Sequence, residues 1–365
     1  MAYTSIITII LVFISILIGF FLSKILNSDK EKNLSTLFIS SGIGLVLSSF
    51  ASLTDKIIDI INYLIGSNHI VSDNNYGSMT CGFILIAIGI YYNKNIRDRF
   101  FVLNFLSKDR RMISDINVVK DLKLSDFKLR EHSIDIVRMF QDGSNITKKS
   151  SDYIVDEIEE KANCFVNQSK EFERAFTGMG AIPYSILLGT YLSSTEINEY
   201  FEYDGHKKKY YALKDKKTFK KDDFQKLDKI DLEINKKSID VVVALSISYP
   251  VTDVALTQFD GKDIIKIGVT TPKDNIIRSK EQLSNYVTEI VKTLEALKED
   301  YSKLETVHLV GAIPSCLSIE LGRRISLRRN RLVRIISYQY ISSSVPKYVW
   351  GIVVNGKDKG SLIKV

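Results

Sequence analysis

The chain has 365 residues, of which 45% are apolar, and it carries a formal net charge of +7. Its three cysteines and four histidines are scattered along the sequence, which excludes a disulfide framework and a zinc site as organising features. The sequence also contains no Walker A, G-x-S-x-G, H-E-x-x-H or EF-hand pattern. It therefore offers ample material for a hydrophobic core but no recognisable catalytic motif.

The first 96 residues are apolar and carry few charges, unlike the rest of the chain. Three segments in this region predict transmembrane helices, at about residues 3–26, 34–53 and 77–93. Residues 55–66 are too short and too polar for a span and predict a helix at the membrane interface. Small residues of the second segment, such as Gly42 and Gly44, either allow close helix packing in lipid or simply occur there.

Basic residues set the expected orientation of these helices. The first predicted loop contains Lys24, Lys30 and Lys32, and lysines and arginines follow the third segment, whereas residues 54–77 contain only Lys56. By the positive-inside rule, the N-terminus lies outside and the large C-terminal part lies in the cytoplasm.

Residues 97–170 predict a helical connector, because apolar side chains such as Tyr153, Ile154, Ile158 and Phe165 recur among charged ones at intervals typical of a helix. The connector shows no feature beyond a solvated linker or packing layer.

Strand and helix patterns alternate from residue 238 onward. Residues 239–245, 264–269, 306–310 and 332–338 are apolar runs of strand composition. Between the second and third runs, Ser279 and Gln282 predict a capping box, followed by an amphipathic helix to about Lys298. This alternation predicts an α/β fold with a mostly parallel sheet, to which residues 348–354 add an antiparallel edge strand.

The phrase Gly-Ala-Ile-Pro occurs twice, beginning at Gly180 and at Gly311. Each copy falls between a predicted strand and a predicted helix. The repeat therefore suggests two related halves, at about residues 171–237 and 238–365, whose helix N-termini face each other. Backbone N–H groups at such helix ends favour anions.

The stretch from about Phe172 to Tyr340 resembles the SAVED domain, the cyclic-oligonucleotide sensor of the bacterial anti-phage systems called CBASS. The motifs that carry the resemblance are GAIPYSILLG at 180–189, HKKKYY at 206–211, LSISYP at 245–250, HLVGAIP at 308–314 and RIISY at 334–338. The family more often has Arg followed by Trp-x-Trp where this chain has Lys and Tyr. The resemblance implies two fused CARF-like, Rossmann-type halves behind the N-terminal transmembrane helices.

The resemblance also implies a function. A membrane-anchored effector at the bacterial inner membrane would bind a cyclic di- or trinucleotide from a partner cyclase, without a further cofactor and without contacting DNA or RNA directly. Binding would drive homo-oligomerisation or rearrangement, and the transmembrane helices would then disrupt the bilayer to abort infection. The chain itself is expected not to be an enzyme.

The expected ligand site combines helix starts, strand ends and, through the resemblance, two lysines. Its residues are Pro183, Tyr184, Ser185, Lys207, Lys208, Ser246, Ser248, Tyr249, Thr270, Pro314, Ser315, Cys316 and Tyr338. The tyrosines either stack on bases or cover the sheet edge. His308 lies in a predicted buried strand, where a core histidine is favoured over a catalytic base.

Two other functions stay open. A membrane-tethered nuclease would degrade the cyclic nucleotide, with His206, Lys207 or Ser315 as base or nucleophile. A structural membrane protein would instead bind another protein through its Rossmann-like part and would have no affinity for nucleotides.

Overall fold

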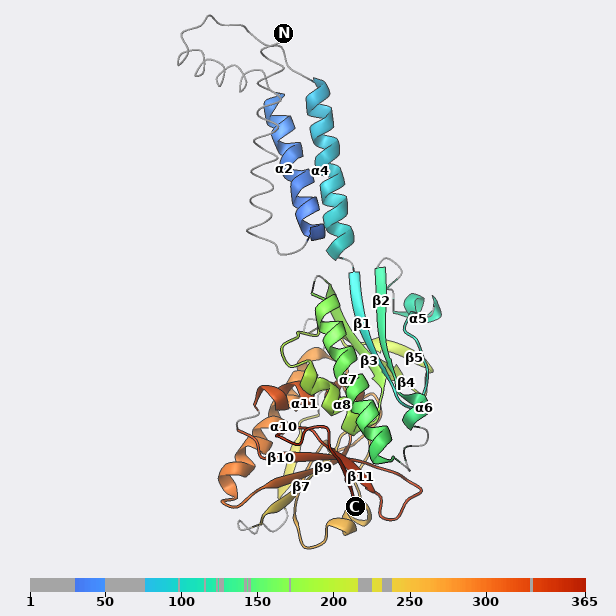
Figure 1. Cartoon of the computed structure of the whole chain (residues 1–365), viewed down its shortest axis with the longest axis vertical. Helices are drawn as coiled ribbons and strands as arrows, with labels where there is room; N and C mark the ends of the chain where they lie inside the picture. Colours follow the sequence, from blue (N-terminus) through green and yellow to red (C-terminus); the bar gives the residue numbers. More distant parts are fainter. Residues whose placement is uncertain are drawn as a thin grey trace, which may run out of the picture. The chain divides into compact units, whose positions relative to one another are not determined.

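The computed structural model (Figure 1) describes residues 30–49, 76–97, 99–114, 116–122, 124, 128–140, 143, 146–170, 172–215, 225–231, 238–328 and 331–365. The chain divides into two units, Met1–Arg99 and Phe100–Val365. The predicted span at 3–26 and the predicted interfacial helix at 55–66 lie outside the described residues.

Two helices form the described part of the first unit, α2 (Lys30–Ser48) and α4 (Tyr76–Arg97), and they lie side by side. Glycines allow this close contact, because a Cβ added to Gly42 would come within 2.6 Å of the carbonyl oxygen of Gly82. The Ser35 hydroxyl donates a hydrogen bond across the pair to the carbonyl oxygen of Gly89 at 2.8 Å. Small residues thus allow the two helices to pack closely, which is the first of the two alternatives for Gly42, although the structure does not test the lipid environment.

Among the described residues, no helix combines the length and the apolarity needed to cross a membrane. The predicted spans at 34–53 and 77–93 are therefore helical over their described residues, but the structure does not support them as membrane crossings.

The first sheet of the second unit has five strands in the order β2-β1-β3-β4-β5. Strands β1, β3 and β4 are parallel, and β5 is antiparallel to β4. In chain order the strands are β1 (Arg99–Leu106), β2 (Lys128–Asp135), β3 (Glu173–Met179), β4 (Glu199–Asp204) and β5 (Lys209–Ala212).

The helical connector predicted at 97–170 needs correction, because β1 and β2 both belong to this segment. The β1 residues 101–106 are apolar or amide side chains that are all buried, as in a central parallel strand covered on both faces. The rest of the segment does contain helices, namely α5 (Ile116–Asp121), α6 (Val137–Phe140) and α7 (Lys148–Gln168).

The second sheet has seven strands in the order β12-β11-β10-β9-β7-β8-β6. Its four central strands are parallel, which confirms the α/β alternation predicted for this half. The strands are β6 (Asp228–Asp231), β7 (Asp240–Ser246), β8 (Asp263–Gly268), β9 (Thr306–Ala312), β10 (Arg334–Gln339), β11 (Trp350–Val353) and β12 (Leu362–Lys364).

Two details of this sheet differ from the prediction. Strand β11 is antiparallel as expected, but β12 pairs with its outer side, so β11 is not the edge. Strand β6 pairs with β8, so the halves divide between β5 and β6 rather than at residue 238.

The two copies of the repeated phrase lead into α8 (Ile182–Tyr191) and α11 (Ser315–Leu327), which cross each other between the halves. A glycine inside each helix, Gly189 in α8 and Gly322 in α11, makes the crossing possible. A Cβ on Gly189 would overlap the carbonyl oxygen of Ile319, and a Cβ on Gly322 would overlap that of Ile186.

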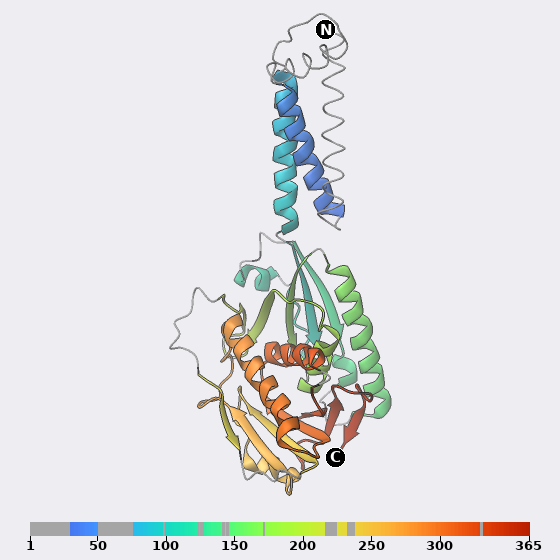
Figure 2. The same cartoon turned by 90° about the vertical axis from the view of Figure 1, so that its left-hand side faces the viewer.

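Helix α10 (Lys280–Asp300), orange in Figure 2, packs next to α11 and ranks with α7 as the longest helices of this unit. Half of its predicted capping box is present, since the Ser279 hydroxyl accepts from the backbone N–H of Gln282 at 3.1 Å. The Gln282 side chain accepts from the N–H of Arg278, one residue before the cap. The remaining elements of this half are α9 (Asp253–Leu256) and the 3₁₀ helix η3 (Thr257–Phe259).

One large hydrophobic core joins both sheets through α7, α8, α10 and α11. Two smaller cores cover the outer faces of the sheets: residues such as Phe259 and Tyr348 cover the second sheet, and residues such as Ile113 and Tyr210 cover the first. The parallel strands of both sheets are thereby held firmly, with their carboxyl ends near the two helix starts.

Candidate functional site

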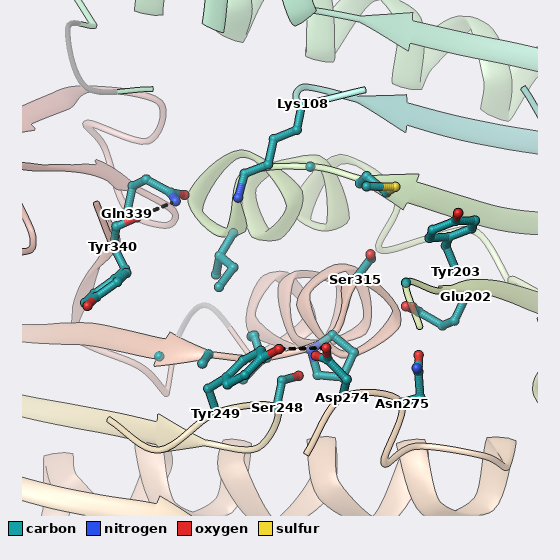
Figure 3. Close-up of a pocket in the computed structure, with 18 of the residues that line it drawn as sticks. Lys108, Glu202, Tyr203, Ser248, Tyr249, Asp274, Asn275, Ser315, Gln339 and Tyr340 are labelled. Carbon is teal, nitrogen blue, oxygen red and sulfur yellow. Dashed lines mark hydrogen bonds between the residues drawn. The ribbon is translucent and has the colours of Figure 1, made fainter. Parts of the chain in front are cut away.

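A cavity of about 1000 Å³ lies between the two halves and is lined by residues of both. The lining residues follow the carboxyl ends of parallel strands: Lys108 after β1, Gly180 after β3, Ser248 after β7 and Gln339 at the end of β10. In open α/β sheets ligands bind at these ends. Figure 3 shows side chains from both halves pointing into this space.

Among the described residues that line the cavity, all the lysines and arginines belong to the first half. They are Lys108, Arg111 and Lys208, which we call the first-half wall. The Arg111 guanidinium lies 3.9 Å from the centre of the Tyr203 ring, and its Nε is paired with the Asp109 carboxylate at 2.6 Å. These contacts restrain the Arg111 side chain.

A side-chain turn positions Lys208. The Asp204 carboxylate accepts hydrogen bonds from the backbone N–H groups of His206 and Lys207 at 3.1 and 3.0 Å. These bonds stabilise the ionised form, so the pKa of Asp204 is lowered, first through the N–H of Lys207. Lys208 then takes a left-handed backbone conformation, φ 51°, which closes the turn between β4 and β5.

The second half contributes aromatic and hydrogen-bonding side chains: Tyr249, Asp274, Gln339 and Tyr340, which we call the second-half wall. The two tyrosines are 56% and 43% exposed, as stacking on a ligand requires. The Tyr249 hydroxyl donates to the Asp274 carboxylate at 2.7 Å, the dashed line at the centre of Figure 3. This hydrogen bond raises the pKa of Tyr249.

The start of α11 is already occupied by a carboxylate. Glu202 of β4 is buried, and its Oε1 accepts a hydrogen bond from the backbone N–H of Cys316 at 2.5 Å. Burial raises the pKa of Glu202 to about 7, although hydrogen bonds from Cys316 and Ser315 oppose the shift. A buried acid from the first half thus satisfies the helix end at which an anion was expected.

The side chains near this helix start are not arranged for nucleophilic catalysis. The Ser315 hydroxyl donates to the carbonyl oxygen of Gly178 at 2.6 Å. The Cys316 thiol is fully buried, and burial raises its pKa. No group of metal-ligating side chains occurs within the described residues.

Five of the residues predicted from the sequence line the cavity, namely Lys208, Ser248, Tyr249, Pro314 and Ser315. The predicted residues of α8 do not. Pro183, Tyr184 and Ser185 are buried, and the Tyr184 hydroxyl donates to the Ser151 side chain at 2.9 Å. Its ring packs against Trp350, so Tyr184 belongs to the core that joins the sheets.

The other predicted residues also lie away from the cavity lining. Lys207 is exposed on the turn beside Lys208, and the Thr270 hydroxyl donates to Asp228. The Ser246 hydroxyl accepts from the N–H of Val251 at 3.0 Å. Tyr338 is 2% exposed and contacts His308 on the outer face of the second sheet, with the hydroxyl 2.9 Å from the ring Nδ1. His308 is accordingly a core histidine.

Sequence analysis missed Lys108, Arg111, Asp274, Gln339 and Tyr340. A signal was present for the first two, because they follow an apolar run, just as Ser248 follows residues 239–245. For Gln339 the signal was the two-residue period of a strand, by which its side chain faces the opposite way from that of Tyr338.

Comparison with known proteins gives a family. The model of the SAVED domain, described as the SMODS-associated and fused to various effectors sensor domain, matches residues 158–354. No curated protein sequence matches the chain.

Solved structures of the Acinetobacter baumannii Cap4 SAVED/CARF-domain containing receptor are similar. The structure with the cyclic trinucleotide 2′3′3′-cAAA is 16% identical in sequence. The match covers 90% of this chain and 67% of the Cap4 chain, with a TM-score of 0.48. A second Cap4 structure, whose description gives no nucleotide, is also 16% identical. The match covers 90% of this chain and 66% of the Cap4 chain, with a TM-score of 0.47.

The family match spans more than half of the chain and includes both copies of the repeated phrase. It confirms the resemblance that the sequence motifs indicated, and the paired α/β sheets agree with it. The chain belongs to the SAVED sensor-domain family.

Proposed function

We propose that the chain is a sensor that binds a cyclic di- or trinucleotide in the cavity between its halves. The observation that carries this proposal is the contrast between the two walls. Cations of the first-half wall suit phosphates, and exposed tyrosines of the second-half wall suit stacked bases. A volume of about 1000 Å³ is large enough for such a ligand.

Two further considerations support this ligand class. The chain belongs to a family of sensor domains, and the Cap4 receptor has been solved with two cyclic trinucleotides.

We propose that the ligand is bound without being cleaved. The three residues considered for a nuclease are unsuited to activate a nucleophile. Ser315 donates its hydroxyl hydrogen to a carbonyl oxygen, the His206 side chain is 83% exposed, and Lys207 is not among the residues that line the cavity. The sensor is therefore favoured over the membrane-tethered nuclease.

Calorimetric titration of the full-length chain with a panel of cyclic di- and trinucleotides tests this function. We expect one or more members to bind with micromolar or tighter affinity, and mass spectrometry afterwards to recover the ligand intact. Absence of binding by every member would refute the sensor, and recovery of a linear product would establish the nuclease instead.

We propose in addition that the N-terminal unit is the effector, located at the bacterial inner membrane with the second unit in the cytoplasm. Its helices carry large apolar side chains on their outer faces: Phe83, Ile84, Ile90 and Tyr91 are each more than half exposed. Such a surface favours contact with lipid. Ligand binding would then drive self-association, and the clustered N-terminal units would perturb the bilayer.

Fractionation of cells and dye release from vesicles test the membrane part. We expect the full-length chain to sediment with the inner membrane and to release dye from phosphatidylethanolamine–phosphatidylglycerol vesicles only when the ligand is present. Recovery in the soluble fraction, or release that does not depend on the ligand, would contradict this part and leave the sensor intact.

A further inference from the structure

The two walls of the cavity differ in charge, and the difference orients the ligand. Phosphates of a cyclic oligonucleotide will be drawn to Lys108, Arg111 and Lys208, all on the first-half wall. The second-half wall has an acid, Asp274, and no lysine or arginine among the described lining residues. With its phosphates at these cations, the ligand would turn its bases toward the second half.

Hydrogen-bond acceptors of the second-half wall are available to those bases. Gln339 is only 7% exposed, and its side-chain oxygen has no hydrogen-bond partner, while its amide nitrogen donates to the carbonyl oxygen of Tyr340 at 3.0 Å. A buried acceptor without a partner destabilises the folded chain. An N–H donor from a ligand in the cavity would supply that partner.

Asp274 is the second acceptor, and its position is fixed by its neighbours. The Tyr249 hydroxyl holds one carboxylate oxygen at 2.7 Å, and the Nε2 of His206 lies 4.0 Å from the same oxygen. Asn275 follows with φ 57°, so the backbone turns sharply at this point. A carboxylate can accept several hydrogen bonds and donate none, which suits a base edge with adjacent donors.

Guanine is the common base whose Watson–Crick edge carries two adjacent donors, N1–H and the 2-amino group. Adenine, cytosine and uracil each place an acceptor beside their donor on that edge, and this acceptor would face the carboxylate. We propose that Asp274 is a specificity-determining residue that selects a cyclic oligonucleotide containing at least one guanine. This inference rests on the proposed sensor function and names the ligand that the sensor prefers.

The test compares ligands that differ in one base. The full-length chain is titrated with the cyclic trinucleotides AAA and AAG, with the cyclic dinucleotides AA and GA, and with forms in which inosine replaces guanine. We expect each guanine ligand to bind about tenfold to a hundredfold more tightly than its adenine counterpart. Inosine lacks the 2-amino group and should give an intermediate affinity.

The variant Asp274→Asn separates base reading from simple charge. An asparagine side chain both donates and accepts, so it can pair with the edge of adenine. We expect D274N to weaken guanine ligands and strengthen adenine ligands, which inverts the preference. If Asp274 acted only through its negative charge, D274N would instead bind both guanine and adenine ligands more tightly. The variant Asp260→Asn, at an exposed acid of the same half outside the cavity lining, should leave every ratio unchanged.

The variant Tyr249→Phe tests whether the hydroxyl orients the acid. It keeps the ring but removes the hydrogen bond to Asp274, so we expect it to reduce the guanine preference severalfold without abolishing binding. Tight binding with the same guanine-to-adenine ratio in wild type and D274N would overturn the role of Asp274 and leave the sensor standing. Absence of binding by all ligands would overturn both proposals.

Discussion

The same four residues, Gly-Ala-Ile-Pro, stand at the starts of α8 and α11, but different chemistry satisfies the two helix starts. Near the start of α8, the Ser107 hydroxyl accepts from the backbone N–H of Ala181 at 2.8 Å. At the start of α11, the Glu202 carboxylate accepts from the N–H of Cys316. A repeated phrase therefore specifies a repeated backbone, whereas the side chain that accepts from each helix start comes from elsewhere in the first half: a neutral hydroxyl just after β1 for α8, and a carboxyl group on β4 for α11.

The comparison extends to the whole cavity, since among the described lining residues only the first half supplies lysine and arginine, whereas the second half supplies the two exposed tyrosines, Tyr249 and Tyr340. Related halves have thus taken different parts in one site. Four substitutions probe what the halves share and where they differ.

The shared feature is the glycine at the helix crossing. Gly322→Ala should lower the free energy of unfolding by about 3 kcal/mol or more, because the new methyl group would overlap the carbonyl oxygen of Ile186. Denaturant unfolding followed by circular dichroism measures the change. Gly205→Ala is the control, since a Cβ there meets nothing within 4 Å. Equal unfolding midpoints for the two variants would contradict the tight crossing.

The first difference is the acid at α11. Burial raises the pKa of Glu202 from 4.5 to about 7, so the folded chain holds this proton more tightly than the unfolded chain. The resulting stabilisation, about 3 kcal/mol, is present below pH 4.5 and is lost as the pH rises through 7. Glu202→Gln cannot titrate and should flatten this part of the stability profile.

Unfolding measured from pH 4.5 to pH 8 checks this prediction. Ser107→Ala, the counterpart at α8, should cost about 1 kcal/mol at every pH. Glu305→Gln, at an exposed glutamate, should follow the wild-type profile. Parallel profiles for wild type and E202Q would show that Glu202 is ionised in the folded chain throughout.

The second-half wall is tested by removing an exposed ring. Tyr249→Ala should weaken the ligand by about tenfold or more, because one base loses its stacking partner. Tyr338→Phe, which changes a tyrosine on the outer face of the same sheet, should leave the affinity unchanged. Calorimetry measures both. Equal losses would mean that the ligand contacts the outer face.

The first-half wall is tested by two neighbouring lysines, of which only Lys208 lines the cavity. Lys208→Gln should weaken the ligand about fivefold at low salt and less at high salt, because an exposed cation–phosphate contact is screened by ions. Lys207→Gln should change the affinity less than twofold. The loss of affinity caused by Tyr249→Ala should not depend on salt. An equal salt dependence of the losses in both variants would contradict the assignment of phosphates to the first-half wall and bases to the second-half wall.

Local patterns predicted the second half well. Its parallel strands are continuous apolar runs, and α10 begins at Lys280, directly after its predicted cap Ser279. In the first half, the same kind of run at residues 100–106 was assigned to a helical connector, because the helical spacing near Ile154 and Ile158 was extended over the whole segment. Pairing of β1 with β3, more than 60 residues later, cannot be read from local sequence.

The site was predicted in part for a similar reason. Strand ends and helix starts give the correct edge of the sheet, and they located Ser248, Tyr249 and Pro314. Which side chain of a strand end faces the cavity depends on register and on the neighbouring core. Tyr338 and Tyr184 are accordingly core residues. The contact between Glu202 and α11 joins residues 114 positions apart in the two halves, so local sequence does not predict it.

Photocrosslinking is the measurement that tests the central claim most directly. A cyclic oligonucleotide with a photoreactive base is irradiated with the full-length chain, and the labelled peptides are mapped by mass spectrometry. We predict labelling of the second-half wall, at residues 248–252 or 338–341, and loss of the label when unmodified ligand competes. Labelling confined to residues outside the cavity, or no label that competes, would contradict a ligand bound between the halves.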